Sequence, residues 1–264
     1  MFKDMTLGSY FPGDSYIHKL DPRTKILLTL AFMIIVFLVK TGWGYLMLGC
    51  FFLTVAFISG IPLLFYLKSL KPLMFILIFT VIINVFFTTG ETPLFKLAFI
   101  TVYPEGLNQA FFMGMRLVFL IVGATVMTLT TSPIELTDGL ERLLSPLAAL
   151  KFPAHEMSMM MTIALRFIPT LIEETDKIMK AQKARGADFE SGNIMARAKA
   201  MVPLMVPLFV SAFRRADDLA MAMEARCYRG GDGRTRLHVL KMRMRDGVAA
   251  ICMVALGAAI VLLG

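Results

Sequence analysis

The sequence predicts an all-α integral membrane protein with about five transmembrane helices. Of its 264 residues, 57% are hydrophobic and 17% are charged, and the mean hydropathy is +0.71. A soluble domain is about 45–50% apolar and about 25% charged. Apolar runs separated by short polar segments account for the difference, and such runs are typical of helices that cross a bilayer.

Five apolar segments are the candidate spans. The first begins at Asp21-Pro22, because Asp is a favoured N-cap and Pro fits the first helical position, and its apolar run covers 26–39. The other runs cover 45–58, 73–87, 107–129 and 247–263. The first two runs are short for a bilayer that needs about 20 residues, so the sequence leaves open whether both are full spans. The stretch near 94–102 is too short to cross and is expected to be an interfacial helix.

Charged residues are concentrated in the segment 132–245, which holds 18 of the 27 Lys and Arg and 13 of the 19 Asp and Glu residues. The sequence therefore predicts an N-terminal membrane part over 1–131 with four spans, a charged domain over 132–245 and a C-terminal transmembrane helix over 246–264. Basic residues favour the cytoplasmic side of a membrane. Their distribution predicts a multi-pass protein of the cell membrane, with the N-terminus and the charged domain in the cytoplasm and the C-terminus outside.

Two long helices are predicted in the charged domain, after a shorter one. Ser132-Pro133-Ile134-Glu135 is a capping box that begins the short helix. Pro153 begins the first long helix, which runs toward Arg185 with an interruption at Pro169. The second long helix covers about 194–229. In both long helices the first half is apolar and the second half is amphipathic.

Both long helices end in the pattern Ala-x-x-Ala-Arg-small, at 181–186 and again at 222–227. A single Ala-Arg-Gly most often only caps a helix C-terminus. Two copies at the ends of two similarly divided helices favour docking into a partner, since small neighbours let a guanidinium enter a groove and Arg is enriched at binding hot spots. Both interpretations stay open on the residues alone. The candidate residues are Ala184, Arg185, Gly186, Ala225, Arg226 and Cys227.

Methionine is the second unusual feature of the charged domain. Twelve of the 21 Met residues fall between Ser132 and Arg245. Filling of a core is the simpler explanation. An adaptable contact surface is the alternative, because the unbranched thioether repacks against different partners.

Arg116 lies in the middle of the fourth apolar run. Ionisable residues inside a membrane are functional candidates. A structural role is expected here, in which the side chain either snorkels toward the membrane surface or pairs with a polar group such as Asn84.

Signals for catalysis are weak. The turn Gly230-Gly231-Asp232-Gly233 lacks the Lys-Ser/Thr of a nucleotide-binding loop. The three Cys and three His match no metal motif. The sequence therefore predicts no catalytic residue, metal site or cofactor in this chain. The alternative function, a membrane-embedded enzyme acting on lipid phosphates, would need convergent acids or a metal cluster at the membrane surface.

Several stretches together resemble the transmembrane T-component of energy-coupling factor (ECF) transporters, the CbiQ-like family of vitamin and metal-ion importers. They are SYIHKLDPRTK at 15–25, LTTSPIEL at 129–136, ALRFIPTL at 164–171, and the two motifs AQKARGADF and AMEARCYRG, followed by Arg234-Thr235. One departure is Cys227, where the second motif commonly has Gly or Ser. Because Cys is also small, the mechanical role is expected to be kept.

The resemblance implies a membrane scaffold with two long, crossed cytoplasmic coupling helices. It also implies two ABC ATPase partners, one for each Arg motif, which would bind the ATP and Mg²⁺ that this chain does not, and one or several substrate-binding S-components. The implied S-component contacts are Met157, Met160, Met161, Met201 and Met205. No nucleic-acid partner is implied. The implied function is coupling of ATP hydrolysis to vitamin or metal-ion uptake, with the substrate chosen by the S-component.

Overall fold

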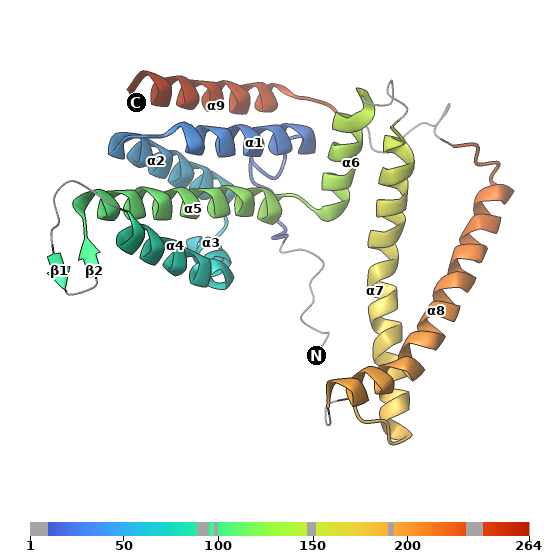
Figure 1. Ribbon diagram of the computed structural model, residues 1–264. Helices are drawn as coiled ribbons and strands as arrows, with labels where there is room; N and C mark the ends of the chain where they lie inside the picture. Colours follow the sequence, from blue (N-terminus) through green and yellow to red (C-terminus); the bar gives the residue numbers. More distant parts are fainter. Residues whose placement is uncertain are drawn as a thin grey trace. The chain divides into compact units, whose positions relative to one another are not determined.

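The structure is a computed structural model that describes residues 10–88, 95–97, 100–146, 152–189, 193–230 and 240–263 (Figure 1). These residues are almost entirely α-helical, as predicted. They form two compact units. The membrane unit contains the described residues from 10 to 139 and from 240 to 263, and the two-helix unit contains those from 140 to 230.

The membrane unit is built from apolar helices. They are α1 (Pro22–Leu38), α2 (Gly42–Ser59), α3 (Leu63–Leu70), α4 (Met74–Phe87), α5 (Pro104–Thr130) and α9 (Met244–Leu263), with a 3₁₀ turn (Lys71–Leu73) between α3 and α4. Four stretches of the described chain are long and apolar enough to cross a membrane: Gly42–Ser59, Leu63–Phe87, Pro104–Thr130 and Met244–Leu262. The remaining predicted span, the first along the chain, corresponds to α1, which has 17 residues.

The first two helices begin where local caps place them. The Asp21 side chain accepts a hydrogen bond from the Arg23 N–H at 3.0 Å, so α1 begins at the predicted position. The Thr41 hydroxyl accepts from the Gly44 N–H at 3.3 Å. This cap starts α2 at Gly42, ahead of the apolar run on which the prediction was based.

The expected interfacial helix near 94–102 is wrong. Strands β1 (Phe95–Leu97) and β2 (Ile100–Val102) form an antiparallel hairpin there, with Leu97 opposite Ile100, while residues 94, 98 and 99 lie outside the described chain. Isolated helices shorter than about 12 residues are marginal. The β-branched residues 100–102 favour extended backbone instead.

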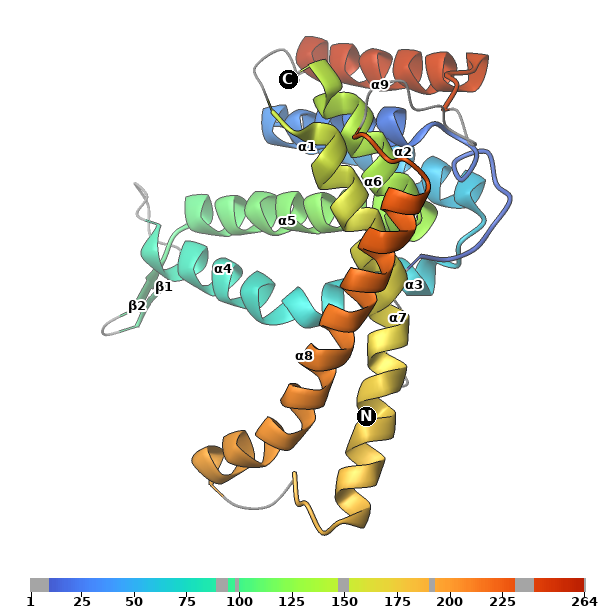
Figure 2. The same ribbon diagram turned by 90° about the vertical axis from the view of Figure 1, so that its right-hand side faces the viewer.

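The core of the membrane unit lies between α1, α2, α5 and α9, which run side by side in Figures 1 and 2. Its fully or nearly fully buried side chains include Val36, Leu48, Phe119 and Ile260. The buried Asp246 joins the starts of two of these helices. Its Oδ1 accepts from the Asp21 N–H and its Oδ2 from the Arg243 N–H, both at 2.8 Å. The N-terminal ends of α1 and α9 are therefore adjacent.

Arg116 stabilises the end of α1. Its Nη2 donates to the Val39 carbonyl at 3.3 Å, and its guanidinium lies over the Phe37 ring at 5.7 Å from the centroid. The expected pairing with Asn84 is wrong, because that side-chain amide donates to the Thr80 carbonyl at 2.8 Å within α4. These contacts are those of a structural residue that satisfies a helix C-terminal carbonyl.

The predicted capping box is confirmed at the start of α6 (Pro133–Leu144), the helix that joins the two units in sequence. The Ser132 N–H donates to Glu135 Oε2 at 3.2 Å, and the Glu135 N–H donates to Ser132 Oγ at 3.3 Å. Two backbone donors at the helix start are thereby satisfied reciprocally.

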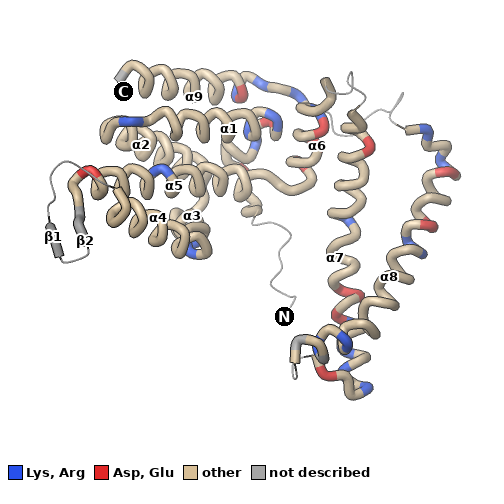
Figure 3. The backbone as a smooth tube through the Cα atoms, viewed as in Figure 1, with Lys and Arg blue, Asp and Glu red and all other residues tan. Residues whose placement is uncertain are grey.

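The two-helix unit contains α7 (Ala154–Ala184) and α8 (Ile194–Ala225), which cross in both Figure 1 and Figure 2. The predicted interruption at Pro169 is wrong, since α7 continues through it, and α8 likewise continues through Pro203 and Pro207. Each Pro removes one backbone donor, and the remaining hydrogen bonds of a helix of more than 30 residues carry it past that point. Figure 3 shows charged residues spread along α7 and α8 but gathered at the first turns of α1 and α9.

Candidate functional site at the ends of the two long helices

The first Arg motif is a Schellman turn that ends α7. Gly186 has a left-handed backbone with φ +88°. The Ala187 N–H donates to the Gln182 carbonyl and the Gly186 N–H to the Lys183 carbonyl, both at 3.0 Å. These are the two hydrogen bonds that define the motif. Arg185 is the C-cap residue.

The second Arg motif builds the same turn at the end of α8. Cys227 has φ +54°. The Tyr228 N–H donates to the Met223 carbonyl at 3.0 Å and the Cys227 N–H to the Glu224 carbonyl at 2.9 Å. Every donor and acceptor lies 41 residues after its counterpart in the first turn. The repeated pattern in the sequence therefore encodes one backbone turn made twice.

The turn explains why Gly follows the first Arg, whereas Cys227 in the second turn bears the cost of the same backbone. A left-handed backbone costs an L-residue roughly 1–2 kcal/mol, whereas Gly adopts it freely. Cys227 is the one non-Gly residue with positive φ in the part of the chain that the structure describes. The sequence pattern suggested clearance in a groove as the reason for small neighbours, and the backbone conformation adds a second reason at Gly186.

All six predicted motif residues lie on the surface. Arg185 and Arg226 are exposed, as are the Ala before and the small residue after each of them. Within the described ranges, neither guanidinium takes part in an ion pair. Each turn thus presents a free cation on a hydrogen-bonded backbone, and a carboxylate or a carbonyl cluster of another molecule is a suitable partner.

The two helices are joined by an ion pair that the sequence analysis did not predict. Arg215 Nη2 donates to Glu174 Oε2 at 2.9 Å, and Arg215 Nε donates to the Ser211 hydroxyl at 3.4 Å. Both residues lie in the second halves of their helices, which the sequence predicts to be amphipathic. Their separation of 41 residues, equal to the spacing of the Arg motifs, is the signal that could have identified the pair.

This ion pair divides the helices symmetrically. Glu174 precedes Arg185 by 11 residues, and Arg215 precedes Arg226 by 11 residues. At about 1.5 Å of rise per residue, each Arg turn lies about 16 Å along its helix from the crossing. The two exposed guanidinium groups therefore lie at the ends of arms of equal length.

The predicted Met surface is exposed in the chain. Met157, Met160 and Met161 on α7 and Met201 and Met205 on α8 all have large exposed fractions, which reach 59% at Met160. Core filling therefore does not account for these five side chains. Further exposed apolar residues continue along α8; they include Val202, Val206, Phe209 and Phe213. Apolar exposure on this scale is typical of a surface that a partner or a membrane covers.

Metal-binding chemistry does not emerge from the described residues. Among them, no three or more His, Cys, Asp or Glu side chains come together in a way that could hold an ion. His155 Nδ1 lies 3.1 Å from Glu141 Oε1, a hydrogen-bond contact that links α6 with α7. Within the described part of the chain, no third His, Cys, Asp or Glu completes a metal site with them.

Comparisons with known proteins identify relatives in a single family of transporter subunits. The family model described as "Cobalt transport protein" (CbiQ) matches residues 13–237. The chain is 57% identical over 257 residues, 97% of its length and 95% of the relative's, to the protein of Clostridium kluyveri named energy-coupling factor transporter transmembrane protein EcfT. Proteins of the same name in Thermosediminibacter oceani and Bacillus subtilis are 55% and 49% identical, over 94% and 98% of this chain and 94% and 97% of theirs.

These matches cover nearly the whole chain, including the membrane helices and both Arg turns. They decide between the two function classes that the sequence left open, because relatives across the full length are transporter subunits rather than enzymes on lipid phosphates. The chain is a multi-pass membrane protein that belongs to the CbiQ family, as a non-catalytic transmembrane component of an energy-coupling factor transporter.

Proposed function

We propose that the chain couples ATP hydrolysis by two partner ABC ATPases to the uptake of a vitamin or a metal ion through a substrate-binding S-component. The pair of matched Arg turns carries this proposal. Each turn presents one exposed guanidinium, and both lie 11 residues from the shared ion pair of Glu174 with Arg215. Two equal arms that end in the same turn suit two equivalent motor subunits.

Arg185 and Arg226 each anchor one ATPase in this proposal. A Schellman turn fixes the backbone on both sides of each Arg, so a push on the side chain is transmitted into the helix rather than absorbed by a loose end. The small residues that flank each Arg allow the partner surface to approach closely. The ATPases supply the ATP and Mg²⁺ sites.

The Met surface holds the S-component. Its five Met residues lie on the apolar first halves of α7 and α8. Met157, Met160 and Met161 lie far along α7 from the Arg185 turn, whereas α8 begins beside the end of α7 (Figure 1), so Met201 and Met205 extend this surface toward that turn. Unbranched Met side chains adapt to different partners. A surface of this kind can serve one dedicated S-component or several in turn.

The N-terminus and a coupling domain over 132–245 lie in the cytoplasm, with the membrane parts over 1–131 and 246–264. The concentration of basic residues in the coupling domain supports this orientation. The contact of Asp246 with the Asp21 N–H supports it as well, because α1 and α9 then begin on one side of the bilayer. The C-terminus follows on the outer side.

Substitution of the two Arg residues tests the proposal. Truncation of a desolvated interface Arg costs about 2 kcal/mol or more. Arg185→Ala and Arg226→Ala are each expected to lower substrate uptake and ATPase co-purification from the assembled complex, and the double variant to abolish nearly all uptake. Lys183→Ala, two residues before the first Arg, is the control and should matter less. Normal coupling in the double variant would show that both turns are ordinary helix caps.

A further inference from the structure

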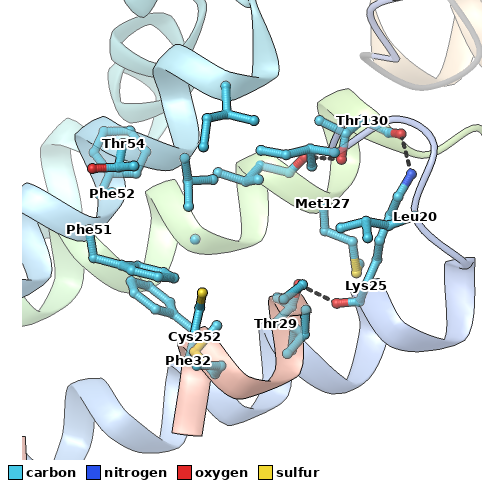
Figure 4. A pocket seen from close by; sticks show the side chains of 18 of the residues that line it. Leu20, Lys25, Thr29, Phe32, Phe51, Phe52, Thr54, Met127, Thr130 and Cys252 are labelled. Carbon is cyan, nitrogen blue, oxygen red and sulfur yellow. Dashed lines mark hydrogen bonds between the residues drawn. The ribbon is translucent and has the colours of Figure 1, made fainter. Parts of the chain in front are cut away.

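A cavity of about 530 Å³ lies inside the membrane unit (Figure 4). It is bounded by the first half of α1, the second half of α2, the end of α5, the first half of α9 and the segment 16–20. All of these lie toward the end of the unit at which α1 and α9 begin. Phe32, Phe51, Phe52 and Met127 form much of its wall. Its volume is within the range of about 300–1,000 Å³ that is usual for small-molecule sites.

The cavity wall offers almost no hydrogen-bonding group to a water molecule. The hydroxyl groups of Thr29, Thr54 and Thr130 donate to carbonyls of their own helices at 2.7–2.8 Å. Lys25 contributes its aliphatic stem, while its buried ammonium group donates to the carbonyls of His18 at 3.0 Å and Thr130 at 2.8 Å. A buried water needs two to four polar partners. An apolar ligand is therefore the suitable occupant.

The cavity opens sideways between two membrane-length helices. Its deep wall is buried, with Phe32 and Met253 among the least exposed residues of the unit. By contrast, its lining residues on α2 and α9, among them Ile58, Val248 and Cys252, are exposed. Since α2 and α9 are both long and apolar enough to span a bilayer, a gap between them faces hydrocarbon chains. The bilayer itself can thus supply the occupant.

The cationic side chain of Arg245 lies near the polar end of the cavity. Tyr16 lines that end, and its hydroxyl donates to the Arg245 carbonyl at 2.9 Å. The Arg245 guanidinium lies over the Tyr16 ring at 6.0 Å from the centroid. Arg245 is exposed and lies in the first turn of α9, where the apolar helix meets polar chain. Tyr and Arg are typical of the headgroup level of a membrane.

We propose that this cavity binds a membrane phospholipid, with one acyl chain between α1, α2, α5 and α9 and the phosphate beside Arg245 and Tyr16. The lipid enters laterally through the opening between α2 and α9. The proposal rests on the membrane unit alone and does not depend on the roles of the Arg turns.

Tryptophan quenching by a brominated lipid provides the test. Trp43 is the single Trp of the chain, so Trp43→Phe gives a silent background into which a reporter is placed. Phe51→Trp reports on the cavity wall, and Phe79→Trp on the lipid-facing surface of α4 is the matched control outside the cavity. The purified full-length chain in detergent is titrated with phosphatidylglycerol that carries bromine on its acyl chains. Saturable quenching at one lipid per chain is expected for the cavity reporter, and only a gradual, non-saturating decrease for the control.

Cavity-filling variants make the result specific. Cys252→Phe, or Thr54→Phe on the opposite rim, is expected to remove the saturable phase, whereas Val254→Phe on the same helix, outside the lining, keeps it. Arg245→Gln is expected to raise the lipid concentration needed for half-saturation severalfold. Equal, non-saturating quenching at both reporters would overturn the proposal, as would persistence of the saturable phase in both filled variants.

Two further outcomes identify a different occupant and likewise overturn the proposal. Saturation by a brominated free fatty acid but not by phosphatidylglycerol would assign the site to a fatty acid. If lipid quenching is lost when purified S-component is added but is kept without it, the cavity would be assigned to a helix of that partner.

Discussion

Gly186 and Cys227 occupy the same position in two copies of one helix-ending turn, with φ angles of +88° and +54°. The first turn uses the residue that this backbone favours, and the second uses one that it disfavours. The two copies are therefore equal in hydrogen bonding but unequal in conformational cost.

Cys227→Gly is expected to stabilise the end of α8. Replacing a left-handed L-residue by Gly contributes about 1 kcal/mol, the lower end of its usual cost, which corresponds to an about fivefold smaller equilibrium constant for local opening. Hydrogen exchange at the Tyr228 amide, which donates to Met223, measures this directly. The converse variant, Gly186→Ala, should speed exchange at the Ala187 amide. Unchanged exchange in both variants would show that the turns are not limited by this backbone position.

Arg185→Lys and Arg226→Lys are expected to restore little of the uptake that the Ala variants lose. An ammonium group retains the charge but cannot reproduce the planar, bidentate donor geometry of a guanidinium. Uptake and ATPase co-purification in the assembled complex are the measurements. Full activity of both Lys variants would show that the contact depends only on the positive charge.

The ion pair of Glu174 with Arg215 is expected to hold the crossing of α7 and α8. Glu174→Arg places a second cation where the Glu174 carboxylate now lies 2.9 Å from the Arg215 guanidinium, so uptake should fall. The double exchange with Arg215→Glu should recover part of the lost uptake. The pair is partly solvated, so its own contribution to stability is at most about 1 kcal/mol. Glu173→Arg, at the exposed neighbouring position, is the control. A double exchange no better than the single variant would argue against a direct pair.

Met160→Asp combined with Met161→Asp is expected to release the S-component while both ATPases stay bound. Two carboxylates on an apolar contact surface must be desolvated when the partner binds, and that cost is large without a compensating partner. Co-purification of each subunit is the measurement, and Met221→Asp, an exposed Met near the Arg turn, is the matched control. Loss of the ATPases with retention of the S-component would reverse the assignment of the two surfaces.

Cys227 gives a direct test of orientation. In a Cys50→Ala, Cys252→Ala background it is the single thiol of the chain, and it is exposed. A membrane-impermeant maleimide should label it only after the cells are permeabilised. Labelling of intact cells would place the coupling domain outside. A labelling site near Gly233 lies outside the described residues, which makes the native Cys227 the better choice.

The sequence by itself determined features that depend on neighbouring residues. Asp21 before Pro22 and Ser132 three residues before Glu135 specify helix starts because a side chain and a backbone N–H within one turn satisfy each other. The apolar runs identified the membrane helices for a similar reason, since their length and composition are set along one segment. The repeat at 181–186 and 222–227 marked two helix-ending turns of the same kind, although their left-handed backbone was not evident from composition.

Tertiary structure decided what depends on residues far apart in the chain. Arg116 pairs with the Val39 carbonyl 77 positions away, Lys25 with that of Thr130 105 positions away, and Arg215 with Glu174 41 positions away. Each of these cations had several candidate partners in the sequence. The choice follows from where helices cross and which side chains face the crossing, and helix periodicity alone fixes a face but not its neighbour.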